Sequence, residues 1–212
     1  MLFSINLVSK TNKDFTKAWI NKRRVSSNEM HSLNIMTIRL ILFFFVSILV
    51  QKSMLYTFTK DSDISDWTII DDVVMGGKSY GNFYLNEDGN GVFEGRVSLE
   101  NNGGFSSLRH QLSKTGIEKH STVVLRVKGD GKKYQFRIKD KRSNYYSYVS
   151  YFKNPKEWQT IRIPLSEMYA NFRGRRLNIP NYDKKTIEEI GFLIGNKTAE
   201  DFNLEIDHIA LE

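Results

Sequence analysis

Short segments in which apolar and polar residues alternate recur along most of this chain, and they constrain its fold more than any other feature. In YQFRIKD, Tyr134, Phe136 and Ile138 fall on one face of an extended strand, and the residues between them fall on the other. Comparable segments are FSSLRHQL, NYYSYVSYF, WQTIRIPL, EEIGFLIGN and FNLEIDHIALE. About ten such strands with short turns, and hardly any amphipathic helix beyond a turn near 165–169, predict an all-β fold, an antiparallel β-sandwich.

Two glycine-containing turns predict how neighbouring strands connect. Gly129-Asp130-Gly131 joins TVVLRVK to KKYQFRI, which is typical of a hairpin. NEDGNG at 86–91 predicts a second hairpin between SYGNFYL and GVFEGRVSL; its acids lack the ligand spacing of an EF-hand, so a calcium site is not expected. Pro164 is expected to end its strand, because proline cannot donate to a ladder.

The N-terminal 57 residues have the character of a leader, with an apolar run, LILFFFVSILV, at 40–50. As a helix this run covers roughly 16 Å, too little for a hydrocarbon core of about 30 Å but typical of an export signal or short anchor. Met36 is an alternative start to Met1. We therefore expect a leader at 1–57, outside the fold, and one domain at 58–212. Export to a bacterial envelope, or membrane attachment, is the favoured location.

Two other interpretations of the leader stay open. Residues 1–35 are basic, contain serine and are poor in acids, as in an organellar presequence, which would place the protein in mitochondria. Alternatively, the apolar run is a buried helix of the fold.

Charge and cysteine content exclude several functions. The net charge is +7, but 1–57 holds eight Lys and Arg against two acids, leaving 23 basic and 22 acidic residues. A nearly neutral domain has little attraction to nucleic acid, despite the local cluster of Arg173, Arg175 and Arg176. The absence of cysteine excludes disulfides, thiol catalysis and thiolate metal sites.

No catalytic or cofactor motif is complete. The histidines show no HExxH spacing, and GGFSSLR around Ser106 and Ser107 lacks the nucleophile-elbow pattern. GGKS at 76–79 resembles the end of a P-loop, but Asp72 stands where the upstream glycine belongs. Asp71 and Asp72 would point to opposite faces of a strand. We expect no enzyme, no cofactor and no metal site.

Two glycine blocks, VVMGG and NNGGF, are expected to form sharp corners. There Gly76 and Gly77 would adopt positive φ or permit close backbone approach, while Val74 or Met75, and Phe105, enter the core. The corners could converge on one rim and form a partner surface. The structural alternative is that Asp72 and Arg109 only pair and cap strand ends.

The ordered set of Trp67, DDVVMGGKS, FEG at 93–95 and LENNGGFSSLR at 99–109 resembles the complex I intermediate-associated protein 30 family. The resemblance implies a jelly roll of the galactose-binding type and a chaperone-like factor for assembly of NADH:ubiquinone oxidoreductase, without catalytic residues. It implies protein subunits of a membrane-associated complex as partners, although the apolar run allows a different envelope complex. The partner-binding residues it suggests are Asp72, Met75, Gly76, Gly77, Ser79, Asn102, Gly103, Gly104, Phe105, Ser107 and Arg109.

A tyrosine-rich strand supports an alternative function. In NYYSYVSYF, Tyr146, Tyr148 and Phe152 alternate with Tyr145 and Tyr151, so one set can fill the core while the other faces solvent. Tyr146 and Tyr148 are the candidates for stacking on a sugar, as in a jelly-roll carbohydrate-binding module. Cross-strand packing is the structural alternative.

Overall fold

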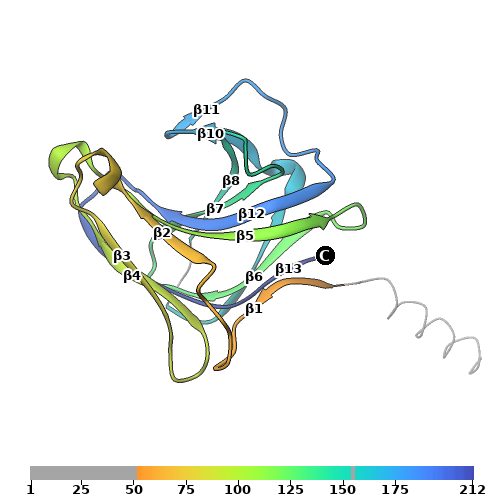
Figure 1. Ribbon diagram of the computed structural model, residues 1–212, viewed down its shortest axis with the longest axis horizontal. Coiled ribbons are helices and arrows are strands. Elements are labelled where there is room, and N and C mark those ends of the chain that lie inside the picture. Colours follow the sequence, from red (N-terminus) through yellow and green to blue (C-terminus); the bar gives the residue numbers. More distant parts are fainter. Residues whose placement is uncertain (1–51, 154–155) are drawn as a thin grey trace, which may run out of the picture. The chain divides into compact units, whose positions relative to one another are not determined.

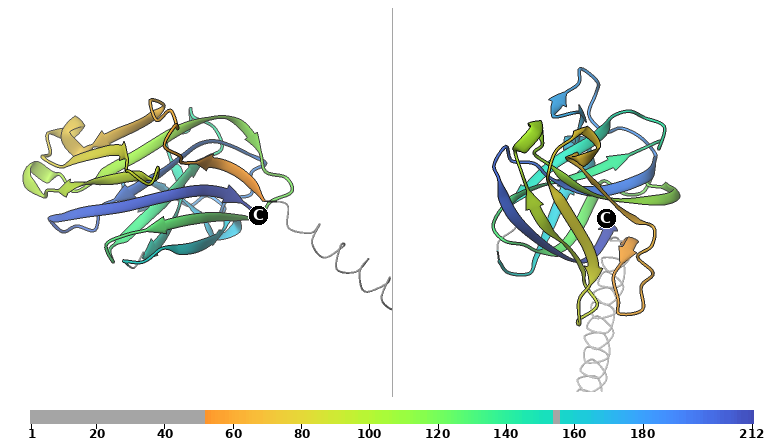
Figure 2. Two further views of the ribbon diagram at one scale, coloured as in Figure 1. Left: turned by 90° about the horizontal axis from the view of Figure 1, so that it is seen from below. Right: turned by 60° about the vertical axis from the view of Figure 1, so that its left-hand side comes forward.

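The computed structural model describes residues 52–153 and 156–212, which form two antiparallel sheets packed face to face (Figures 1 and 2). Sheet A has the order β3-β4-β13-β6-β9, with β1 also paired to β13; sheet B has the order β11-β10-β8-β7-β12-β5-β2. The predicted all-β jelly-roll sandwich is confirmed.

The strands of sheet A are β1 (Ser53–Thr57), β3 (Tyr80–Leu85), β4 (Gly91–Val97), β6 (Thr122–Lys128), β9 (Gln159–Pro164) and β13 (Glu200–Leu211). Those of sheet B are β2 (Trp67–Asp71), β5 (Ser106–Gly116), β7 (Lys133–Lys139), β8 (Ser147–Lys153), β10 (Tyr169–Phe172), β11 (Arg175–Arg176) and β12 (Thr186–Ile194). Three 3-10 turns interrupt them: η1 (Asp72–Met75), η2 (Glu100–Asn102) and η3 (Leu165–Glu167).

The core lies between the two sheets and follows the alternation of the sequence. Tyr134, Phe136 and Ile138 of β7 are fully buried, and they belong to one cluster with Phe192 of β12 and Leu204 of β13. Burying an aliphatic or aromatic side chain of this size contributes about 1.5–3 kcal/mol. In a chain without cysteine, this packing is the main source of stability.

Of the two predicted hairpins, one is confirmed and one is wrong. β3 and β4 pair across the NEDGNG turn, where the Asn86 side chain accepts hydrogen bonds from the N–H groups of Asp88 and Asn90. The strands on either side of Gly129-Asp130-Gly131 do not pair, because β6 lies in sheet A and β7 in sheet B. This turn therefore carries the chain from one sheet to the other.

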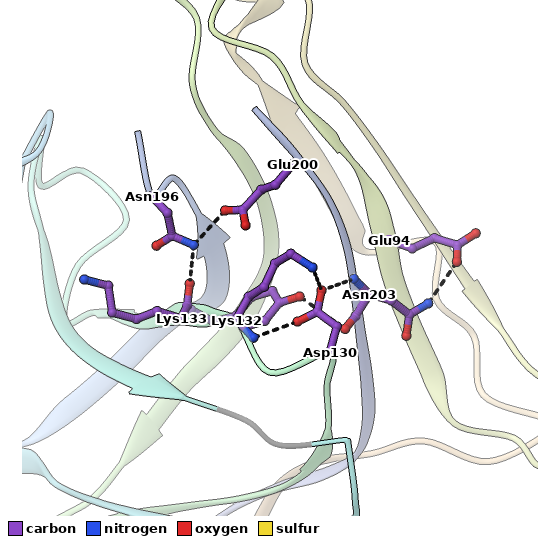
Figure 3. A network of polar contacts seen from close by, with 8 residues as sticks. Glu94, Asp130, Lys132, Lys133, Asn196, Glu200 and Asn203 are labelled. Carbon is purple, nitrogen blue, oxygen red and sulfur yellow. Dashed lines mark hydrogen bonds and ion pairs between the residues drawn. The ribbon is translucent and has the colours of Figure 1, made fainter. Parts of the chain in front are cut away.

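Polar contacts hold this crossover against the last described strand (Figure 3). The Asp130 carboxylate accepts hydrogen bonds from the backbone N–H of Asn203 at 3.0 Å and of Lys132 at 3.0 Å. The Tyr134 hydroxyl donates to the Asn203 carbonyl at 3.1 Å, and the Asn203 amide donates to Glu94 at 2.9 Å. The crossover, β13 and β4 are thereby connected.

The expected boundary at 57/58 is too late. Ser53–Thr57 form β1, whose residues pair with 208–211 of β13, and Tyr56 packs its ring against Phe58, Trp67 and His110. The domain thus includes five residues that were assigned to the leader, because their partner strand is distant in the sequence. The apolar run at 40–50 lies outside the described residues. Within residues 52–153 and 156–212, no helix is long and apolar enough to cross a membrane.

Candidate functional site

The carboxylate of Asp72 holds the two glycine blocks together. Asp72 opens η1 and is fully buried. It accepts hydrogen bonds from the N–H of Ser79 at 2.9 Å, Gly104 at 2.5 Å and Phe105 at 3.2 Å, and one from the Ser79 hydroxyl. We call this arrangement the Asp72 clasp. It joins residues that lie on either side of β3 and β4 in the sequence.

The hydrogen bonds of the clasp outweigh the effect of burial on Asp72. Burial by itself would raise the pKa of this carboxyl, because it disfavours the charged form. The donors from Ser79, Gly104 and Phe105 nevertheless hold the pKa of Asp72 below its ordinary value of 3.8. Asp72 is therefore an ionised structural anchor at neutral pH.

Two glycines are required by this anchor. A Cβ at Gly77 would lie 2.2 Å from one Asp72 carboxylate oxygen, and a Cβ at Gly103 would lie 2.6 Å from the other. Gly76 has a φ of +90°, in the left-handed region. The expectation of positive φ at one corner glycine and close approach at the other is confirmed.

Three exposed apolar side chains surround the clasp, and we call them the loop tip: Val73, Met75 and Leu99. Their exposed fractions are 59%, 55% and 45%. Val73 and Met75 lie in η1, and Leu99 directly precedes η2; these two turns lie side by side at one end of the sandwich (Figures 1 and 2). The Asn101 amide donates to the Gly76 carbonyl at 3.1 Å, and Lys78 pairs with Glu100 at 2.5 Å. Of the residues expected to enter the core, Met75 is exposed and Phe105 is half-buried outside the core cluster, so the expectation is wrong for both; the side chain of Val74 lies outside what the structure describes.

The predicted partner residues do not all converge on this rim. Ser107 is buried and donates to the Phe192 carbonyl at 3.1 Å. Arg109 lies in the middle of β5, in register with Gly191 of β12 and Thr68 of β2, and makes no ion pair with Asp72. The suggested Asp72–Arg109 pair is therefore wrong. Asn102 is exposed in η2.

The predicted partner-binding residues thus fall into three groups by location. Those inside the clasp or shaped by it are Asp72, Gly76, Gly77, Ser79, Gly103, Gly104 and the backbone of Phe105. Those at the surface of the rim are Met75 and Asn102, and those on β5 are Ser107 and Arg109. Val73 and Leu99 were missed, although an apolar residue in a turn-forming block is a signal that could have found them.

The exposed tyrosines of the segment NYYSYVSYF are not the two that were predicted to stack on a sugar. Tyr148 is fully buried and packs edge-on against Tyr182 at 4.9 Å, and Tyr146 packs against the core. Tyr145 and Tyr151 are exposed, at 65% and 42%. Tyr148 is thus unavailable for stacking on a sugar, because its face of β8 is turned to the other sheet.

The histidines of the domain do not group for chemistry. His110 is buried, stacked on Trp67 at 4.6 Å with planes 15° apart, and burial lowers its pKa. His208 pairs with Asp207 and His120 lies in a turn. Among residues 52–153 and 156–212, no three His, Asp or Glu side chains gather in a way that could hold a metal ion.

Comparison with known proteins connects the glycine blocks to a family. Residues 56–206 match the family model described as complex I intermediate-associated protein 30. The mouse protein named complex I intermediate-associated protein 30, mitochondrial, is 25% identical over 191 aligned residues, which cover 77% of this chain and 57% of the mouse protein. A probable relative of the same name from Caenorhabditis briggsae is 26% identical over 155 residues, covering 60% and 44%. The chain spans about half the length of the curated relatives it matches.

Solved structures with the same architecture include carbohydrate-binding modules. A family 11 module from Clostridium thermocellum, solved with a β-1,3-1,4-mixed-linked tetrasaccharide, aligns with a TM-score of 0.56 and 18% identity over 76% of this chain and 95% of the module. An agarase aligns with a TM-score of 0.52 and 10% identity, over 77% of this chain and 24% of the agarase. At these identities the likeness concerns the fold alone.

Proposed function

The chain belongs to the complex I intermediate-associated protein 30 family, and from this premise we propose that it is a non-enzymatic assembly factor that binds protein subunits of a membrane-associated respiratory complex. The names of the curated relatives support the choice of complex I. The two glycine blocks, which lie inside the matched range, build the scaffold of the loop tip, in keeping with a role in binding.

The loop tip is the observation that carries the binding role. Soluble domains bury most of their large apolar side chains, and a cluster left exposed on a rigid support commonly marks an interaction site. Here the Asp72 clasp fixes both turns, so that Val73, Met75 and Leu99 are presented with little conformational entropy left to lose on binding. The Lys78–Glu100 pair provides the polar rim that such interfaces have.

The relatives also bear on location. Their names describe them as mitochondrial, which supports the presequence alternative over the bacterial envelope. We propose that residues 1–51 direct the protein to mitochondria. A fluorescent reporter carrying residues 1–51 should accumulate in mitochondria, and secretion or a plasma-membrane signal would contradict this.

The binding role is tested by capture of complex I subunits. The full chain carrying an affinity tag should co-purify subunits of complex I from its own cells. Val73→Ser, Met75→Ser and Leu99→Ser together should abolish this while leaving the thermal melt unchanged, because the three side chains make little contact with the core. Met54→Ser is the matched control, since it removes an equally exposed apolar side chain from β1.

The sugar-binding alternative predicts a different result in the same experiment. Its support is the fold likeness to carbohydrate-binding modules and the exposed Tyr145 and Tyr151. A glycan array should be run beside the capture, with Tyr145→Ala and Tyr151→Ala variants. Saturable glycan binding lost in these variants, with no complex I subunit captured, would replace the assembly proposal with a sugar-binding module.

A further inference from the structure

Three residues form a row across the middle of sheet B on the side turned away from the core. Arg137 of β7, Gly191 of β12 and Arg109 of β5 are in register. Their chain neighbours Phe136, Phe192 and Leu108 are buried between the sheets. Because side chains alternate along a strand, the row belongs to the opposite side, which we call the outer face of sheet B.

The middle residue of this row is a glycine that stands between two cationic residues. A Cβ at Gly191 would lie 2.5 Å from the Leu108 carbonyl oxygen, so the backbone itself excludes a side chain there. The Arg109 side chain lies beside the glycine, with its Cγ 3.5 Å from the position that this Cβ would occupy. Gly191 therefore adds no side chain of its own between Arg109 and Arg137.

Neither arginine has an acidic partner. The Arg137 guanidinium donates to the Gln135 side chain at 2.8 Å, and that of Arg109 to the Ser107 hydroxyl at 3.5 Å. Within the described part of the chain, no carboxylate lies at ion-pairing distance from either one. A guanidinium carries five N–H donors, and an arginine that is largely shielded from solvent is normally paired. Burial and the neighbouring Arg109 lower the pKa of Arg137 to about 10, so it remains charged at pH 7.

Several side chains beside this row are shielded from solvent. Several side chains in the same or adjoining rows are buried although they point away from the core: Gln135, Ser147, Val149 and Asn171. Sheet B curls toward this side, and β10 and β11 stand above β5 and β12 in Figure 1. The side-chain oxygen of Asn171 is buried without a hydrogen-bond partner. A polar group of this kind is satisfied when a ligand donor reaches it.

Aromatic rings on this face hold further cations. The Lys133 ammonium lies 4.7 Å from the centre of the Tyr151 ring, and the Arg176 guanidinium lies 4.7 Å from that of Tyr169. Lys139 lies 3.9 Å from Glu189, the acidic side chain in the neighbouring row. A cation therefore lies over one side of each of these two rings, and cationic side chains outnumber acidic ones on this face.

We propose that the outer face of sheet B binds an extended acidic polypeptide segment, whose carboxylates are held by Arg109 and Arg137. The inference deepens the proposed function, on which it rests, by naming the chemistry of the client segment. The planar guanidinium suits bidentate binding of a carboxylate. From Arg109 on β5 to Tyr169 on β10 are four strand spacings, roughly 19 Å, which an extended peptide of about six residues spans and a single small anion does not. A hollow on sheet A is lined instead by Glu94 and Asp201, which would repel such a segment.

The test measures binding of a fluorescein-labelled oligoglutamate peptide to the full chain by fluorescence anisotropy, with oligoglutamine as the uncharged probe. Oligoglutamate should bind and oligoglutamine should not. Arg137→Gln and Arg109→Gln should each weaken binding by about tenfold or more. Arg96→Gln, which removes an exposed arginine from sheet A, should change it less than about twofold. Arg109→Gln is a second, separate variant of the row, so the test stays valid if Arg137→Gln unfolds the protein.

Three results would overturn the proposal. One is equal binding of both peptides, and another is oligoglutamate binding that neither arginine variant weakens. The third is displacement of the peptide by inorganic phosphate or by oligogalacturonate at lower concentration than by unlabelled oligoglutamate, which would assign the face to a small anion or an acidic sugar. The triple loop-tip variant should bind oligoglutamate normally. Failure of this inference is thus distinguishable from failure to capture complex I subunits.

Discussion

The backbone N–H of Gly104 donates a hydrogen bond of 2.5 Å to the carboxylate of Asp72, although the two residues are 32 positions apart in the chain. Four donors from two separate loops meet at this one buried carboxylate. The position of the two loops that carry the loop tip therefore depends strongly on the Asp72 side chain.

Replacing the carboxylate by an amide should destabilise the domain. In Asp72→Asn, an NH₂ group faces backbone donors that it cannot accept from, and we expect a loss of about 2–4 kcal/mol in the free energy of unfolding. Urea denaturation monitored by circular dichroism measures this. Glu100→Gln, which breaks only the exposed pair with Lys78, should cost about 0.5 kcal/mol or less. Equal losses in the two variants would contradict a special role for Asp72.

The contribution of Asp72 to the free energy of unfolding should decrease as the pH is lowered. Its pKa in the folded state is below the ordinary value of 3.8, so the unfolded chain binds the proton more readily than the folded one. The stabilisation is fully present above about pH 4 and is lost as the pH falls through the lower, folded pKa. The stability difference between the wild type and Asp72→Asn should therefore shrink below pH 4. A difference that grows on acidification would show that the folded pKa is raised instead.

Three alanine substitutions separate steric from conformational demands on the glycines. Gly77→Ala places a Cβ against the Asp72 carboxylate and should cost about 3 kcal/mol or more. Gly76→Ala meets no atom within 4 Å but keeps a φ of +90°, so it should cost about 1–2 kcal/mol. Gly116→Ala has neither problem and should be neutral or slightly stabilising. In thermal melts, Gly77→Ala should have the lowest melting temperature, Gly76→Ala an intermediate one and Gly116→Ala the highest. A lower melting temperature for Gly76→Ala than for Gly77→Ala would refute the close-approach explanation.

Truncation should locate the true start of the domain. A chain beginning at Lys52 should melt cooperatively, because β1 and its pairing to β13 remain. A chain beginning at Phe58 loses that pairing and the Tyr56 ring that packs against Phe58, Trp67 and His110, so its free energy of unfolding should fall by about 3–5 kcal/mol. Identical melting temperatures for the two chains would show that β1 contributes nothing.

The sequence predicted the elements of this fold better than their connections. Alternation identifies β5, β7, β8, β9, β12 and β13, because each has one face in the core. It does not tell whether two consecutive strands pair, and Gly129-Asp130-Gly131 suits a crossover as well as a hairpin. β1 was not predicted for a related reason, because its partner strand lies about 150 residues away in the sequence.

The candidate site was predicted in part. The glycine blocks indicated the corners, and the reason for Gly77 was correct. That Asp72 would face inward and bind four donors was not predictable from one sequence, because an acid in a loop is usually solvated. In NYYSYVSYF the two faces could be separated, but which of them meets the core depends on the register of β8 with β7 and β10.

The position of β13 has a consequence for how this protein is made. β13 pairs with β4 and β1 along one edge and with β6 along the other, so it holds sheet A together. It is also translated after every other described strand. During synthesis, the nascent chain can form local pairs such as β3 with β4, but the strands destined for β13 stay open until the ribosome has released it. The domain therefore completes its sandwich only after residues 200–211 have been translated, and until then its apolar strands are exposed to aggregation.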